Sequence, residues 1–170
     1  MAGSAFKKVY YDPAMGRQCA AFIPAEDFIV SYGSSDLTTC PRVTHVMRKT
    51  ENEVRFLQVN GFYASVDLGE PGFSRTSIQE KKDKTEGVEV QEDNRYELLE
   101  MHVEYDLGED SDQIALPYVV TIDRSSLQIL SIYRNWREDD ELRMKRNHFV
   151  HYTYIPGFGF YGFGLIHLLG

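Results

Sequence analysis

The sequence is poor in cysteine, in uninterrupted apolar runs and in positive charge, and each shortage excludes a class of protein. The sequence has only two cysteines, Cys19 and Cys40, which excludes a scaffold stabilised by several disulfides and a four-cysteine zinc site. So few cysteines indicate a reducing, intracellular origin. The longest apolar run, Ile155–Gly170, contains glycines and is shorter than the roughly 20 residues of a membrane-spanning helix. Because the net charge is -8, nonspecific binding of nucleic acid is disfavoured.

What the chain does contain points to a folded, strand-rich protein. Hydrophobic residues make up 42% and charged residues 26%, which excludes wholesale disorder. Aromatic residues, at 13%, favour a core built on β-sheet. A length of 170 residues suits one domain, so we expect residues 1–170 to form a single α+β domain, predominantly antiparallel β-sheet with one or two short helices. The start, Met1–Tyr10, lacks the apolar core of a signal peptide, which predicts no export.

Alternating apolar residues and turn signals predict most of the strands. A turn at Asp12-Pro13 separates Phe6–Tyr11 from Arg17–Ile23, which predicts a hairpin. Further strands are predicted at Phe28–Tyr32, Arg42–Met47, Leu116–Asp123, Gln128–Trp136 and His148–Ile155. The last three are expected to form an antiparallel meander, because short turns or charged segments separate them.

Two helices are predicted. Thr50 and Glu53 have the spacing of a capping box, in which each residue accepts a hydrogen bond from the other's backbone amide. The helix that follows is expected to end near Gly61 and to bury a stripe of apolar residues, Val54, Leu57 and Phe62. The polar, lysine-rich stretch Ser77–Thr85 predicts a second, solvent-exposed helix.

Acidic residues are concentrated in the middle of the chain, where residues 80–112 hold thirteen of the 26. Apolar and polar residues alternate from Leu99 to Asp106, which is the period of a half-exposed strand. We expect its apolar face to be buried and its polar face, with Glu100, His102 and Glu104, to lie in solvent. A metal ion on that face is the alternative, but alternate residues on one strand stand roughly 7 Å apart, too far to complete a coordination shell alone.

No catalytic motif is present. The sequence lacks a G-x-x-x-x-G-K-[ST] loop, a G-x-S-x-G elbow and an H-E-x-x-H helix, so we predict no enzyme, no catalytic residues, no metal and no cofactor. Gly157–Gly162 matches G-x-G-x-x-G, but a dinucleotide site also needs a helix, a second strand and an acidic residue about 20 positions later. We expect these glycines to let the backbone approach a neighbour, with the adjacent aromatic residues as anchors.

A short basic stretch surrounds the single tryptophan. Trp136 is interleaved with Arg134, Arg137, Arg143, Lys145 and Arg146, a pattern that suits phosphate or an acidic protein surface. Asp139, Asp140 and Glu141 lie among these residues, so ion pairs within the turn are the stronger alternative. Contact with the acidic face of another copy is a third.

The second half of the chain resembles a known family. Arg134-Asn135-Trp136, Phe149-Val150-His151-Tyr152 and the segment Ile155–His167 look like the portal proteins of short-tailed bacteriophages and related prophages. Asp12-Pro13, Cys19–Tyr32 and Ala115–Val120 are also similar, and the acidic middle departs most. The resemblance implies a structural part of a ring, usually a dodecamer, that forms the head-to-tail connector at one capsid vertex.

Several partners follow from this resemblance. It implies other portal subunits, capsid, terminase and head-completion proteins, with no membrane, and a location in the virion after synthesis in the bacterial cytoplasm. Portal subunits are several times longer, so the chain resembles an excised wing domain on the outside of the ring, with residues 155–170 leading to a stem. Double-stranded DNA is packaged and ejected through such a ring and is not expected to bind to this part.

The expected assembly interface is aromatic and basic. Its candidate residues are Trp136, Phe158, Phe160, Tyr161, Phe163, Arg134 and Arg137. One alternative is a β-rich protein-interaction module that binds a foreign partner through its aromatic C-terminal segment. Another is a small enzyme or ligand binder, which needs a deep pocket near Glu100–Asp106 or Gly157–Gly162.

Overall fold

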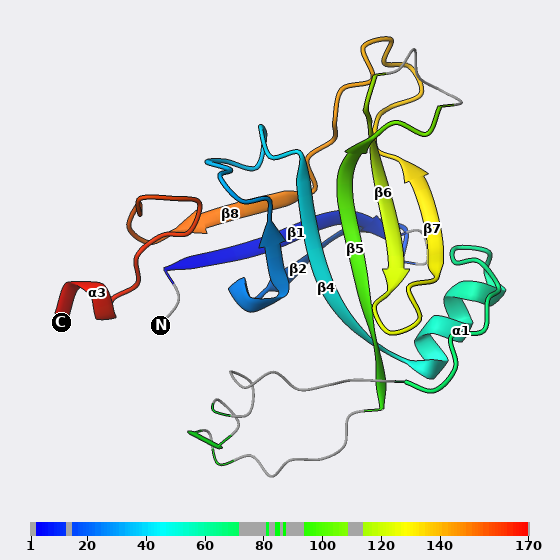
Figure 1. Cartoon of the computed structure of the whole chain (residues 1–170), viewed down its shortest axis with the longest axis horizontal. Coiled ribbons are helices and arrows are strands. Elements are labelled where there is room, and N and C mark those ends of the chain that lie inside the picture. The colour runs from blue at the N-terminus through cyan, green and yellow to red at the C-terminus, as the bar shows by residue number, and fades with distance from the viewer. Residues whose placement is uncertain are drawn as a thin grey trace. The chain divides into compact units, whose positions relative to one another are not determined.

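The computed structural model describes residues 3–12, 15–71, 81, 84–85, 87, 94–108 and 114–169, which form two mainly antiparallel sheets and short helices (Figure 1). The first sheet has the order β2-β1-β8, from β1 (Ser4–Asp12), β2 (Arg17–Ile23) and β8 (Phe149–Thr153). The second has the order β3-β4-β5-β6-β7, from β3 (Phe28–Val30), β4 (Arg42–Thr50), β5 (Arg95–Tyr105), β6 (Leu116–Asp123) and β7 (Ile129–Arg134). The helical elements are η1 (Ala25–Asp27), α1 (Glu51–Val59) and α3 (Ile166–Leu169). The α+β class is therefore confirmed.

The three-stranded sheet joins the two ends of the chain. The hairpin of β1 and β2 is confirmed, with Phe6 opposite Ile23 and Asp12 opposite Arg17. On its other edge β1 pairs antiparallel with β8, so the expectation that β8 continues a meander with β6 and β7 is wrong. After β7 the chain leaves the sheet at Asn135. The side-chain amide of Asn135 donates to the Arg146 carbonyl at 3.1 Å, and the backbone carbonyl of Asn135 accepts from the Arg146 amide at 2.9 Å.

Contacts along the chain divide it into two compact units. Unit 1 comprises Met1–Val46, Glu100–Val120 and Ile132–Gly170, and unit 2 comprises Met47–Leu99 and Thr121–Ser131. Each unit has its own cluster of buried apolar side chains. The prediction of a single domain stays a prediction.

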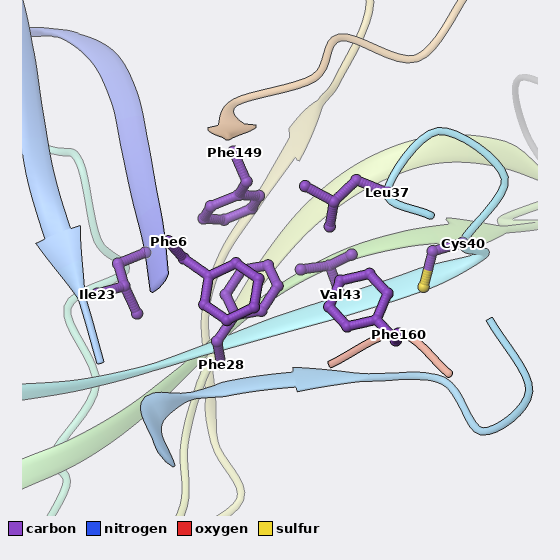
Figure 2. Close-up of a cluster of buried hydrophobic side chains, with 8 residues drawn as sticks. All are labelled: Phe6, Ile23, Phe28, Leu37, Cys40, Val43, Phe149 and Phe160. Atoms are coloured by element: carbon purple, nitrogen blue, oxygen red, sulfur yellow. The ribbon is translucent and has the colours of Figure 1, made fainter. Parts of the chain in front are cut away.

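Aromatic rings dominate the core of unit 1 (Figure 2). Its buried members are Phe6, Ile23, Phe28, Leu37, Cys40, Val43, Phe149 and Phe160. The rings of Phe6 and Phe28 stack with centroids 4.0 Å apart, and Phe149 meets Phe28 edge-on at 5.1 Å. Residues from β1, β3 and β8 therefore meet in one stack, because alternate side chains of each strand point to the same face.

Unit 2 is built around α1, which begins as the sequence predicts. The Thr50 hydroxyl accepts from the Glu53 amide at 3.3 Å, and the Glu53 carboxylate accepts from the Thr50 amide at 2.8 Å. Val54 is buried and Leu57 packs beside it, together with a core of Tyr63, Leu68, Tyr96, Leu98 and Leu130. The predicted burial of Phe62 is wrong, because the helix ends before it and the adjacent Tyr63 fills the core instead. Of the predicted helix at Ser77–Thr85, only residues 81, 84 and 85 are among those that the structure describes, and these three are helical.

Candidate functional site

The strand β5 buries the face that its composition predicts to be exposed. Glu100 and His102 are only 8% and 4% exposed, whereas Tyr105, on the predicted apolar face, is exposed. The prediction of an exposed polar face is therefore wrong for Glu100 and His102 but right for Glu104, and Leu99, Met101 and Val103 on the other face are half-buried. Tyr96 and Leu98 lie on the same face as Glu100 and His102 and are buried with them.

A lysine from β1 makes this burial possible. The Lys8 ammonium lies 2.6 Å from one carboxylate oxygen of Glu100, and His102 Nε2 lies 3.0 Å from the other. Burial by itself would raise the pKa of Glu100, but the hydrogen bond with His102 and the charge of Lys8 outweigh it and lower the pKa to about 2. Glu100 is therefore ionised at neutral pH, with both oxygens paired.

Two further histidines extend the cluster. His148 Nε2 lies 3.0 Å from the side-chain oxygen of Asn135, and its ring meets that of His102 edge-on at 5.4 Å. Burial, followed by the nearby His102, lowers the pKa of His148. Burial also lowers the pKa of His45 to about 4, and the Nδ1 atom of His45 has no hydrogen-bond partner.

Together these side chains form the buried polar cluster, which consists of Lys8, His45, Glu100, His102 and His148. The side chains of its ion pair, Lys8 and Glu100, are 16% and 11% exposed. Within the part of the chain that the structure describes, no three His, Cys, Asp or Glu side chains stand where they could hold a metal ion. The cluster ties β1 to β5 and thereby positions the sheet from which the C-terminal segment leaves.

The C-terminal segment, residues 154–169, is anchored within unit 1 by three consecutive residues, Phe160, Tyr161 and Gly162. Phe160 is 8% exposed and stacks on His151 with centroids 4.8 Å apart. The Tyr161 hydroxyl donates to the Phe28 carbonyl at 2.8 Å, and the Gly162 amide donates to the Ser4 hydroxyl at 2.8 Å. Phe160, one of the candidate interface residues, thus belongs to the core.

Two of the three glycines of the G-x-G-x-x-G sequence, Gly157 and Gly162, allow the segment to pack closely on its own backbone. A Cβ atom on Gly157 would lie 2.4 Å from the Tyr161 carbonyl oxygen, and one on Gly162 would lie 2.7 Å from the Ile155 carbonyl oxygen. Ile155 and Phe163 form an isolated β-bridge across this turn. The structure therefore favours the close-approach interpretation, since these contacts require residues without a side chain.

Most of the apolar side chains of the segment are at least partly exposed to solvent. Phe158 is 103% exposed, with its ring meeting the half-buried Phe163 edge-on. The exposed apolar residues here, named the C-terminal apolar surface, are Phe158, Tyr161, Leu165, Ile166, Leu168 and Leu169. No Asp, Glu, Lys or Arg occurs between residues 154 and 169, so nothing in the segment offsets this apolar character.

The basic residues around Trp136 do not join that surface. The Arg134 guanidinium lies 5.8 Å from the Trp136 ring centroid, and Trp136 meets Tyr118 edge-on at 5.3 Å. Arg137 is exposed, whereas Lys145 turns inward and donates to the Cys40 carbonyl at 2.6 Å. In the described structure, the ring contacts of Trp136 do not reach the C-terminal segment, so the candidate interface residues fall into two groups.

One pocket, of about 420 Å³, lies in unit 2. It is lined by Glu51, Val54, Arg55, Gln58, Ser65, Val66, Asp67, Leu68, Gly69 and Tyr96. Neither of the two stretches that an enzyme or ligand binder was expected to use contributes to this lining.

No protein-family model matches this chain, and no curated protein is similar to it. Among the described residues, no helix is both long enough and apolar enough to cross a membrane.

Proposed function

We propose that the chain is a structural, wing-like domain of a phage portal ring, the head-to-tail connector for DNA packaging and ejection, and that it has no enzymatic activity. The observation that carries this proposal is the C-terminal segment, which is anchored by Phe160 and presents Phe158 and the residues around α3 to solvent. Apolar patches of this kind mark protein interfaces. The proposed partners are other portal subunits, in the virion.

The β-rich interaction module is the second candidate, and the same surface favours it. It differs from the first in its partner, which is a foreign protein, and in its own state, which is monomeric. Oligomeric state therefore separates the two.

The test is light scattering of the chain over a range of concentrations, together with electron microscopy of any associated fraction. We expect the mass to rise with concentration and the particles to include closed rings. Replacing Phe158, Ile166 and Leu169 with serine is expected to weaken association at least tenfold, because it removes apolar area from the contact. A matched control replaces Phe56 and Val59, two exposed apolar residues of α1, in the same way. A monomeric chain, or equal effects of both sets, contradicts the portal proposal.

A further inference from the structure

The three-stranded sheet has a second apolar surface on the face opposite the core. Its outer face consists of Ala5, Lys7, Val9, Tyr11, Gln18, Ala20, Phe22, Val150 and Tyr152, which the strand registers place on one side. Phe22 is 65% and Tyr152 is 51% exposed, in strands on either side of β1. A sheet face of this kind, left open, is normally covered by another element or another chain.

Lys7 stands alone as a charge on this outer face. It lies opposite Phe22 on one side and Val150 on the other, and its ammonium is 5.9 Å from the Tyr152 ring centroid. No carboxylate of the described residues pairs with Lys7, whereas the adjacent Lys8, on the inner face, is paired with Glu100. The surface that covers the outer face should therefore supply apolar side chains and at least one carboxylate.

A symmetric contact between two outer faces does not meet this requirement. Such a contact places the same patch on both copies, so each copy would bring another Lys7 and no carboxylate. A head-to-tail contact, in which the outer face meets a different surface of the next copy, does not have this defect. Repeated contacts of that type close into rings when the rotation allows it.

The connection from β7 to β8 offers the complementary surface (Figure 1, orange). Residues 137–144, named the acidic loop, carry four carboxylates against two arginines. Leu142 and Met144 are 81% and 64% exposed, and Glu138, Asp139 and Glu141 are exposed beside them. The Asp140 carboxylate accepts from the backbone amides of Leu142 at 3.1 Å and Met144 at 2.9 Å, which holds the loop in shape.

We propose that the outer face binds the acidic loop of a second copy of this chain, head to tail, with Lys7 against its carboxylates and Leu142 and Met144 against Phe22 and Tyr152. The inference rests on the proposed assembly role and specifies a contact separate from the C-terminal apolar surface. Both surfaces belong to unit 1, so each copy carries one of each.

The test compares two complementary full-length variants by sedimentation at matched concentrations. Lys7→Glu reverses the charge of the outer face, and Glu138→Lys with Asp139→Lys and Glu141→Lys reverses that of the loop. Each is expected to self-associate at least tenfold more weakly than the unsubstituted chain, because attraction becomes repulsion. In an equal mixture, the intact outer face of one variant meets the intact loop of the other. Mixing is therefore expected to restore association, because the two substituted surfaces also carry opposite charges.

Two controls keep the outcome specific. Lys84→Glu makes the same charge change at an exposed lysine outside the sheet and should leave association unchanged. Phe22→Ser removes apolar area from the outer face without changing charge and should also weaken association. If the unsubstituted chain associates and neither Lys7→Glu nor Phe22→Ser alters it, the head-to-tail contact is wrong while the assembly role stands. If the unsubstituted chain is monomeric at every concentration, the assembly role fails as well.

Discussion

The cores of the two units are of similar size but are assembled from different distances along the chain. In the core of unit 1, Phe6 near the start stacks on Phe160 near the end, and Phe149 belongs to the same cluster. The core of unit 2 uses residues between Met47 and Leu130. Contacts of large sequence separation cost more loop-closure entropy, so unit 1 depends more on each contact that closes it.

The units also differ in their titratable groups. All five histidines of the sequence lie in unit 1, and His45, His102 and His148 belong to its buried polar cluster. Unit 2 contains no histidine. Unit 1 is therefore expected to be more sensitive both to loss of its C-terminal anchor and to acid.

The largest expected effect comes from Phe160→Ala. Removing a buried ring from a core typically costs about 3–5 kcal/mol, because a cavity remains. Phe158→Ala, two residues earlier but fully exposed, is expected to change stability by less than about 0.5 kcal/mol. Urea unfolding followed by the fluorescence of Trp136, which lies in unit 1, measures both. Equal effects would show that Phe160 does not close this core.

Acid should destabilise unit 1 next. The pKa of His45 is about 4 in the folded state, against about 6.5 when exposed, so the unfolded chain binds more protons between these values. Stability should fall as pH drops through this window, by at most about 3 kcal/mol from His45. Glu100 should add to the loss below pH 4.5, because the unfolded chain then binds a proton there, whereas in the folded chain the pKa of Glu100 is about 2.

His45→Phe isolates this effect. It removes the buried Nδ1 atom that has no partner, so we expect equal or higher stability at pH 7 and a shallower loss between pH 6.5 and 4. The measurement is urea unfolding at a series of pH values. An unchanged slope would assign the acid sensitivity to other groups.

A smaller effect is expected from Gly162→Ala. A Cβ atom there would lie 2.4 Å from the Thr153 methyl group and 2.8 Å from the Gly3 carbonyl oxygen, so the backbone must shift. Overpacking of this kind costs about 1–3 kcal/mol. Gly159→Ala is the matched control, because nothing lies within 4 Å of its Cβ position. Thermal unfolding of the pair should show a lower midpoint for Gly162→Ala alone.

The smallest effect should appear in unit 2, as a gain. Leu127, in the turn between β6 and β7, has a φ of 57°, a left-handed conformation that costs residues other than glycine about 1–2 kcal/mol. Its side chain is exposed, so Leu127→Gly loses little packing. We expect a stabilisation of about 0.5–1 kcal/mol in urea unfolding. A loss of stability would mean that the Leu127 side chain contributes more than the strain costs.

Predictions that depend on neighbouring residues succeeded, and those that depend on distant partners were less reliable. The hairpin of β1 and β2 and the capping box of Thr50 and Glu53 were predictable, because both are determined within a few residues. The pairing of β8 with β1 was not predictable, since the alternation of residues in a strand does not determine which strand it pairs with. The burial of Phe160 and the exposure of Phe158 were not predictable either, because both are phenylalanines next to Gly159.

The sequence by itself determined the α+β class, most strand positions and the start of α1, because local periodicity and turn chemistry are sufficient for these. Only the tertiary structure decided which face of β5 is buried. Glu100 would be costly to bury alone, but Lys8, 92 residues earlier, supplies the opposite charge at 2.6 Å and makes its burial possible. Whether a charged residue lies inside or outside depends on what faces it in three dimensions, and that partner can come from anywhere in the chain.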